Sequence, residues 1–107
     1  MRLSADERVE FCCWLAAAEN SLVFAQQSQA VAEGRRKLRQ LRYMFTGADY
    51  SHEPDAARQE ISMLVDKLMD TAIVDAEHTS LVLDDSIDTA IDSLAKAVDV
   101  LRPHLEL

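Results

Sequence analysis

Apolar residues recur along this chain at the spacing of an α-helix, in two long runs that one short loop separates. The loop is the segment Gly47–Pro54, where residues that break helices gather. The rest of the chain holds one other glycine, Gly34, and one other proline, Pro103. With about 100° assigned to each residue, the pattern predicts helices over residues 5–46 and 54–102.

The first run keeps a single apolar face along its whole length. It begins at Ser4 and Glu7, whose spacing is typical of a capping box at a helix start. Since the face shows no phase slip, the pattern favours one continuous helix, with a break within residues 26–34 as the alternative. Asn20 and Gln27 lie on this face and indicate polar layers that set register, a wet seam, or a kink that turns them outward. The face comprises Val9, Cys13, Ala16, Asn20, Val23, Gln27, Val31, Gly34, Leu38, Leu41 and Phe45.

The second run separates apolar and acidic residues onto opposite faces. Asp75 and Leu81 violate this separation, so a break within residues 77–86 is the alternative to one continuous helix. We interpret the acidic ridge as a solvated face, or else as a mimic of a phosphate backbone. The apolar face comprises Ala57, Ile61, Leu64, Leu68, Ala72, Ala76, Leu83, Ala90, Leu94, Ala97 and Leu101; the acidic ridge within 66–99 comprises Asp66, Asp70, Glu77, Asp84, Asp88, Asp92 and Asp99.

Two architectures follow, both all-α and both a single helical domain over residues 1–107. Continuous helices would form a long antiparallel helical hairpin, each helix about 60–70 Å long. Such a hairpin leaves apolar surface uncovered, so it should dimerise into a four-helix bundle. Broken helices would instead form a compact monomeric four-helix bundle. The coherent phases favour the hairpin and its homodimer.

The N-terminal third of the first predicted helix is apolar on a second face as well. A helix that is apolar all round is either buried or binds another molecule. We therefore expect either burial within the bundle or a homodimer, or an interface with another protein in which Trp14 is the anchor, since tryptophan is prominent among interface hot spots. The predicted interface comprises Phe11, Trp14, Leu15 and Leu22.

Basic residues concentrate in one short segment, which is a candidate anion-binding site. We expect the nearby acids Asp55, Glu60 and Asp66 to neutralise it across the loop. The alternatives are an anionic protein partner or nucleic acid, but the net charge of −8 disfavours nucleic acid because like charges repel. The segment comprises Arg35, Arg36, Lys37, Arg39 and Arg42.

Patterns that signal catalysis or a bound cofactor do not emerge. The three histidines lie 26 residues apart and none forms a helical metal-ligand pair. No glycine-rich phosphate loop and no long apolar run occurs, so we predict no enzyme activity, no cofactor, no metal and no membrane span. The adjacent Cys12 and Cys13 cannot bridge within a helix, which indicates reduced thiols in a cytoplasmic protein.

These observations predict a cytoplasmic, non-enzymatic, homodimeric helical protein that acts through protein–protein contacts. A small bacterial or phage regulator or inhibitor that binds a macromolecular partner would fit them. The alternative is a nucleic-acid-associated protein that uses the basic segment 35–42.

Overall fold

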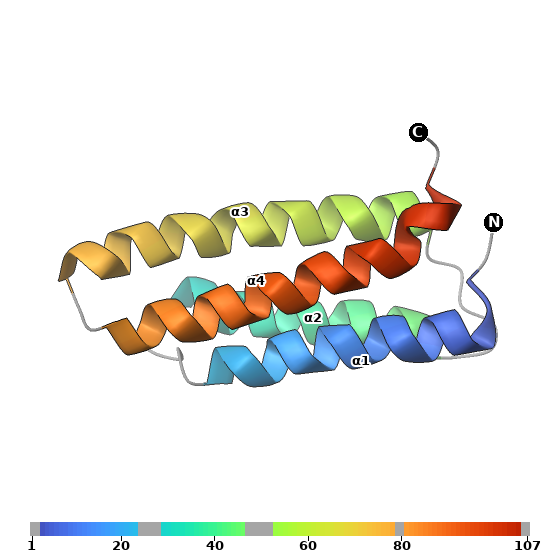
Figure 1. The fold of residues 1–107 in the computed structure, drawn as a ribbon, viewed down its shortest axis with the longest axis horizontal. Coiled ribbons are helices and arrows are strands. Elements are labelled where there is room, and N and C mark those ends of the chain that lie inside the picture. Colours follow the sequence, from blue (N-terminus) through green and yellow to red (C-terminus); the bar gives the residue numbers. More distant parts are fainter. Residues whose placement is uncertain (1–2, 24–28, 47–52, 79–80, 106–107) are drawn as a thin grey trace.

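The computed structural model describes residues 3–23, 29–46, 53–78 and 81–105, with side chains outside 71–85. The helices within these residues pack into an up-and-down bundle (Figure 1). They are α1 (Ala5–Leu22), α2 (Gln29–Thr46), α3 (Pro54–His78) and α4 (Leu81–Leu101), and a short 3₁₀ turn, Arg102–His104, follows α4.

The prediction of one continuous helix over residues 5–46 is wrong. α1 and α2 pack beside each other, and α3 and α4 do the same, so the described residues form the compact four-helix arrangement. The longest dimension is 44 Å, well short of the predicted hairpin. Folding each half back buries apolar surface within one chain rather than leaving it for a second copy. The segments 24–28 and 79–80, which separate these helices in the sequence, lie outside the described residues.

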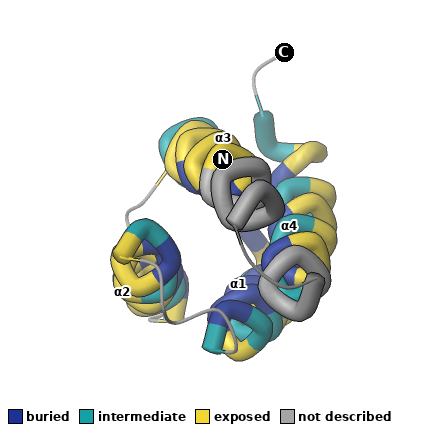
Figure 2. The backbone as a smooth tube through the Cα atoms, turned by 90° about the vertical axis from the view of Figure 1, so that its left-hand side faces the viewer, coloured by how far each residue is buried: buried dark blue, intermediate teal, exposed yellow. Residues whose placement is uncertain are grey.

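One hydrophobic core joins all four helices, and the apolar faces predicted for α2, α3 and α4 point into it (Figure 2). Helix α4 ends before Pro103, as predicted, and Pro54 opens α3. The buried residues that match the prediction are Val31, Gly34, Leu38, Leu41, Phe45, Ala57, Ile61, Leu64, Leu68, Ala90, Leu94, Ala97 and Leu101. The predicted Ala72, Ala76 and Leu83 lie where side chains are not described.

Helix α1 buries the face opposite to the one predicted. Phe11 and Leu15 are fully buried, whereas Val9 is 64 % exposed and Cys13 is exposed. The prediction carried the phase of α2 into α1, but residues 24–28 separate the two helices. Since burial stabilises in proportion to apolar area, the larger side chains fill the core and the smaller ones face outward. Asn20 is exposed too, so it forms no buried polar layer.

The start of α1 is fixed by the predicted capping box. The Glu7 backbone N–H donates to Ser4 Oγ at 3.1 Å, and the Ser4 N–H donates to Glu7 Oε1 at 2.8 Å. The same Glu7 carboxylate contacts His104 of the C-terminal turn, with 2.7 Å between Oε2 and Nε2. The first helix and the last turn of the described chain are therefore tied together.

Candidate protein-binding surfaces

The basic segment of α2 does not form a single patch, because its cations point in several directions. Arg39 and Arg42 reach toward α1, where they pair with Glu19. Lys37 lies on the side that faces α3, and Arg36 is exposed. Arg35 precedes Arg39 by one turn and so shares its side of the helix. The five cations of this candidate anion-binding segment are thus divided among different surroundings.

Glu19 links α1 to α2 through two arginines. Glu19 is only 6 % exposed, and its carboxylate lies 3.0 Å from Arg39 Nη2 and 3.2 Å from Arg42 Nη2. Arg39 Nε also donates to Glu19 Oε1 at 3.1 Å. Charge-assisted contacts of this kind are stronger than neutral ones, although solvent screens the half-exposed Arg39.

The role of Glu19 was not predicted, because the counterions of the basic segment were expected among the acids beyond the loop. The available signal was its position: Glu19 follows Leu15 by four residues and precedes Leu22 by three, next to the face that is buried. An acid at the edge of a buried face needs a cationic partner, and α2 supplies two.

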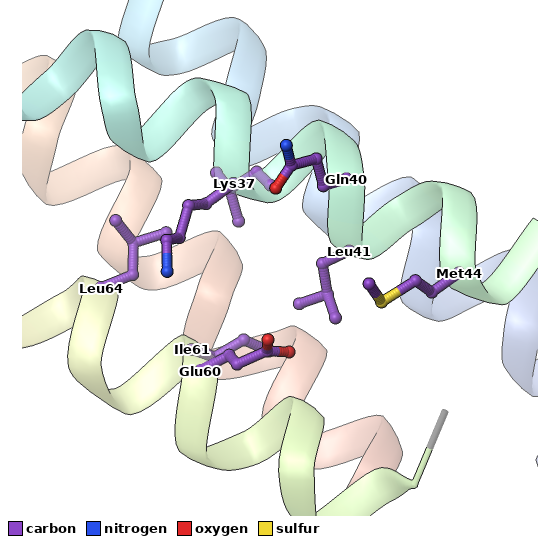
Figure 3. Close-up of a pocket in the computed structure, with 8 residues that line it drawn as sticks. Lys37, Gln40, Leu41, Met44, Glu60, Ile61 and Leu64 are labelled. Carbon is purple, nitrogen blue, oxygen red and sulfur yellow. The ribbon is translucent and has the colours of Figure 1, made fainter. Parts of the chain in front are cut away.

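A trough runs between α2 and α3 and consists of two adjoining hollows that share Lys37, Glu60 and Leu64. Figure 3 shows the hollow that Leu41 and Met44 help to line. Each hollow encloses about 50 Å³, and its lining is mainly apolar. We call this surface the α2/α3 trough. Its residues are Ala30, Glu33, Gly34, Lys37, Leu38, Gln40, Leu41 and Met44 from α2, and Glu60, Ile61, Met63, Leu64 and Lys67 from α3.

Two methionines and one glycine give the α2/α3 trough its character. Met44 is 45 % exposed and Met63 is 60 % exposed, so both thioethers are accessible to a binding partner. At Gly34 a Cβ atom would lie 2.9 Å from Leu64 Cδ1, so the missing side chain lets Leu64 rest close to the α2 backbone. Methionine side chains adapt their shape easily, which suits a surface that receives apolar groups.

The residues predicted as an interface lie mainly in the core. Phe11, Leu15 and Leu22 are fully buried within the single chain, which matches the burial that the sequence left open, and the partner or dimer interface stays a prediction. Phe11 stacks edge-on against Phe45 of α2, with 4.9 Å between ring centroids. Trp14 is half-buried, and Lys96 of α4 places its Nζ 4.7 Å from the ring centroid. Such a cation–π contact contributes about 0.5–1 kcal/mol at an exposed site.

The outward side of α1 borders a second apolar depression, which we call the α1/α2 valley. It encloses about 360 Å³ and is lined mainly by apolar atoms. Cys12 Sγ lies 3.7 Å from the Arg42 carbonyl oxygen, and burial raises the pKa of this thiol. The valley is lined by Ala5, Arg8, Val9, Cys12, Cys13, Ala16, Phe45 and Thr46.

The contact between Glu7 and His104 changes the titration of the carboxyl group. The hydrogen bond from the Ser4 backbone N–H lowers the pKa of Glu7 below its ordinary value, and the hydrogen bond with His104 lowers it further. Both contacts favour the ionised carboxylate.

Within the described residues, no group of three or more His, Cys, Asp or Glu residues is placed to hold a metal ion.

Comparisons with protein-family models, with curated proteins and with solved structures found no match for this chain. Within the described residues, none of the helices is both long and apolar enough to cross a membrane.

Proposed function

We propose that this protein is a non-enzymatic interaction protein that binds an amphipathic helix of another protein in the α2/α3 trough. The observation that carries the proposal is the pair of adjoining apolar hollows beside two exposed methionines. Seating the apolar face of a helix in a groove is a recurring mode of peptide recognition.

The size of the hollows supports a side-chain ligand over a cofactor. Pockets for drug-sized ligands and cofactors typically span about 300–1,000 Å³, whereas each hollow encloses about 50 Å³. A volume of that size accepts a single aliphatic side chain. Because the hollows adjoin, they suit two apolar residues on consecutive turns of one helix, whose Cβ atoms lie about 5–6 Å apart.

The charged rim of the α2/α3 trough further defines the partner. Lys37 and Lys67 border it together with Glu33 and Glu60. A helix seated between these residues should carry charges of both signs beside its apolar anchors, since complementary charge sets register and specificity. A small protein that occupies one helix of its partner would act as a regulator or inhibitor.

The alternative function, nucleic-acid binding by residues 35–42, has weaker support. A phosphate-binding surface gathers cations along one face. In this protein Arg39 and Arg42 pair with Glu19, whereas Lys37 lies on another side of the helix, which faces α3. We expect no binding to random DNA at about 0.15 M salt, measured by fluorescence anisotropy. Binding in the micromolar range that weakens steeply with salt would promote this alternative.

Site-specific photo-crosslinking in cells tests the proposed function. A photoreactive amino acid at Met63, inside the α2/α3 trough, should give a discrete adduct with another protein. Met69 provides the matched control, because it is 50 % exposed on the same helix but does not line the trough. Adducts of equal yield at both positions, or none at Met63, would contradict the proposal.

A further inference from the structure

The methionines that the structure describes lie on the surface, although methionine is among the residue types that proteins often bury completely. Met44, Met63 and Met69 are 45 %, 60 % and 50 % exposed. Among the residues whose side chains are described, the buried core consists of leucine, isoleucine, valine, alanine and phenylalanine and contains no methionine. A small oxidant in solution therefore reaches these thioethers without any opening of the bundle.

Two of the three exposed methionines belong to the α2/α3 trough, one in each hollow. Met44 of α2 lines the first hollow, and Met63 of α3 lines the second (Figure 3 shows the first). Met69 is exposed to a similar extent but lines neither hollow. A chemical change at methionine would therefore alter both hollows of the trough together.

We propose that Met44 and Met63 are oxidation sites through which a peroxide switches off binding in the α2/α3 trough. The inference rests on the proposed function, since it concerns the same surface. The thioether sulfur attacks one oxygen of hydrogen peroxide and the O–O bond breaks. The hydroxide that leaves takes the proton of the transferred oxygen and departs as water. The sulfur loses two electrons and becomes a sulfoxide, and the peroxide gains the two electrons.

A sulfoxide changes what each hollow can receive. The thioether is apolar and adapts its shape to an incoming side chain, whereas the sulfoxide is polar and its oxygen accepts hydrogen bonds from water. An apolar side chain that covers this oxygen displaces the water and gives no hydrogen bond in return. With one sulfoxide in each hollow, an amphipathic helix should bind about tenfold more weakly or worse.

The bundle itself should tolerate the oxidation. Sulfoxides destabilise a fold where they disrupt core packing, and neither Met44 nor Met63 belongs to the core cluster. The oxidised chain should therefore keep its helices and lose only the apolar character of the trough. Methionine sulfoxide reductases, one for each epimer of the sulfoxide, return the thioether. With a dithiol as the reductant, the oxygen leaves as water and the dithiol becomes a disulfide, so the change is reversible.

A photoreactive amino acid at Gln40 tests the inference, because Gln40 is exposed, lines the same hollow as Met44 and leaves both methionines in place (Figure 3). The chain carries Cys12→Ser and Cys13→Ser, which remove competing thiols. It is oxidised with hydrogen peroxide, freed of peroxide by catalase and added at low concentration to an extract of the cells used for the Met63 crosslink. The yield of the partner adduct should fall about tenfold, and both reductases together should restore it.

Leucine substitutions assign the effect to the two methionines of the trough. Met44→Leu combined with Met63→Leu should preserve the adduct after oxidation, because leucine has a similar volume and no sulfur. Met69→Leu is the matched control and should give no protection, since Met69 lies outside the trough. Mass spectrometry verifies one added oxygen on each methionine, and circular dichroism verifies that the oxidised chain remains helical.

The possible results separate this inference from the proposed function. An adduct that survives oxidation of both Met44 and Met63, protection by Met69→Leu, or loss of helical structure on oxidation would each overturn the inference and leave the proposed function standing. If the unoxidised chain gives no adduct from Gln40 or from Met63, the proposed function fails, and the inference fails with it.

Discussion

The contact between α1 and α4 and the contact between α2 and α3 show how side-chain size controls the surface of a bundle. α1 and α4 pack against each other the most extensively of the adjacent helix pairs, and α2 and α3 the least. The buried face of α4 includes the small residues Ala90, Ser93 and Ala97, which allow close packing. The α2/α3 contact instead carries long side chains such as Lys37 and Met63, and it leaves the trough open. The α1/α4 contact is closed and stabilises the bundle, whereas the α2/α3 contact is open and leaves a surface that a partner can reach.

The largest expected difference is between truncations in the two contacts. Leu15→Ala, within the fully buried core of α1, should cost about 3–5 kcal/mol, because a closed core relaxes little around a cavity. Leu41→Ala, on the floor of the α2/α3 trough, should cost about 2–3 kcal/mol, since the site is already partly open. Urea unfolding followed by circular dichroism measures both. Equal losses would show that the two contacts are equally closed.

A bulky residue at Gly34 should force α2 and α3 apart. Gly34→Leu should cost about 1–3 kcal/mol, because even a Cβ atom there would lie 2.9 Å from Leu64 Cδ1. Ala32→Leu, at an exposed position of the same helix, is the matched control and should change the unfolding free energy little. If the two variants unfold at the same urea concentration, α2 and α3 do not meet closely at Gly34.

Removal of the charge on Glu19 should weaken the link between α1 and α2. Glu19→Gln should cost about 1–2 kcal/mol, since Arg39 and Arg42 lose a buried counterion but both retain access to solvent. Glu10→Gln removes a charge at an exposed position of α1 and serves as the control. Chemical unfolding of the three proteins at neutral pH makes the comparison, and an unchanged midpoint for Glu19→Gln would contradict it.

The smallest expected effect is a pH dependence at the start of α1. The folded pKa of Glu7 lies below its ordinary value of 4.5, so its contribution is fully present above pH 4.5 and is lost as the pH falls through the folded pKa. The stability gap between the native chain and Glu7→Gln should therefore close on acidification. Thermal unfolding at a series of pH values measures the gap. Parallel curves down to pH 3 would contradict this assignment.

The sequence predicted the fold class because three of the four helices have a single apolar face. In α2 the buried Val31, Leu38 and Phe45 follow one period, and the charged residues lie on the exposed side. The helix bounds near Pro54 and Pro103 followed from the backbone restrictions of proline.

The buried face of α1 was harder to predict because this helix has apolar residues on two faces. Periodicity alone does not choose between Phe11, Leu15 and Leu22 on one face and Val9 and Cys13 on the other; the neighbouring helices decide. The break between α1 and α2 was expected only as the alternative, within residues 26–34, because residues 24–28 hold neither glycine nor proline.

The α2/α3 trough lay beyond prediction for a related reason. It depends on how Leu64 packs near Gly34 and where Lys37 and Glu60 lie across the contact. These are relations between helices that are distant in sequence, and no local spacing encodes them.

The extensive contact between α1 and α4 has a consequence for the synthesis of the chain. These two helices are the first and the last, so Leu22 and Leu101 stand 79 positions apart although both end in the same core. At about 5–20 residues per second, α1 waits about 4–16 s on the ribosome before all of α4 has been made. During that time the face of α1 that carries Phe11, Leu15 and Leu22 is not yet covered by α4. The nascent chain should therefore engage chaperones early, and slower translation should increase its aggregation.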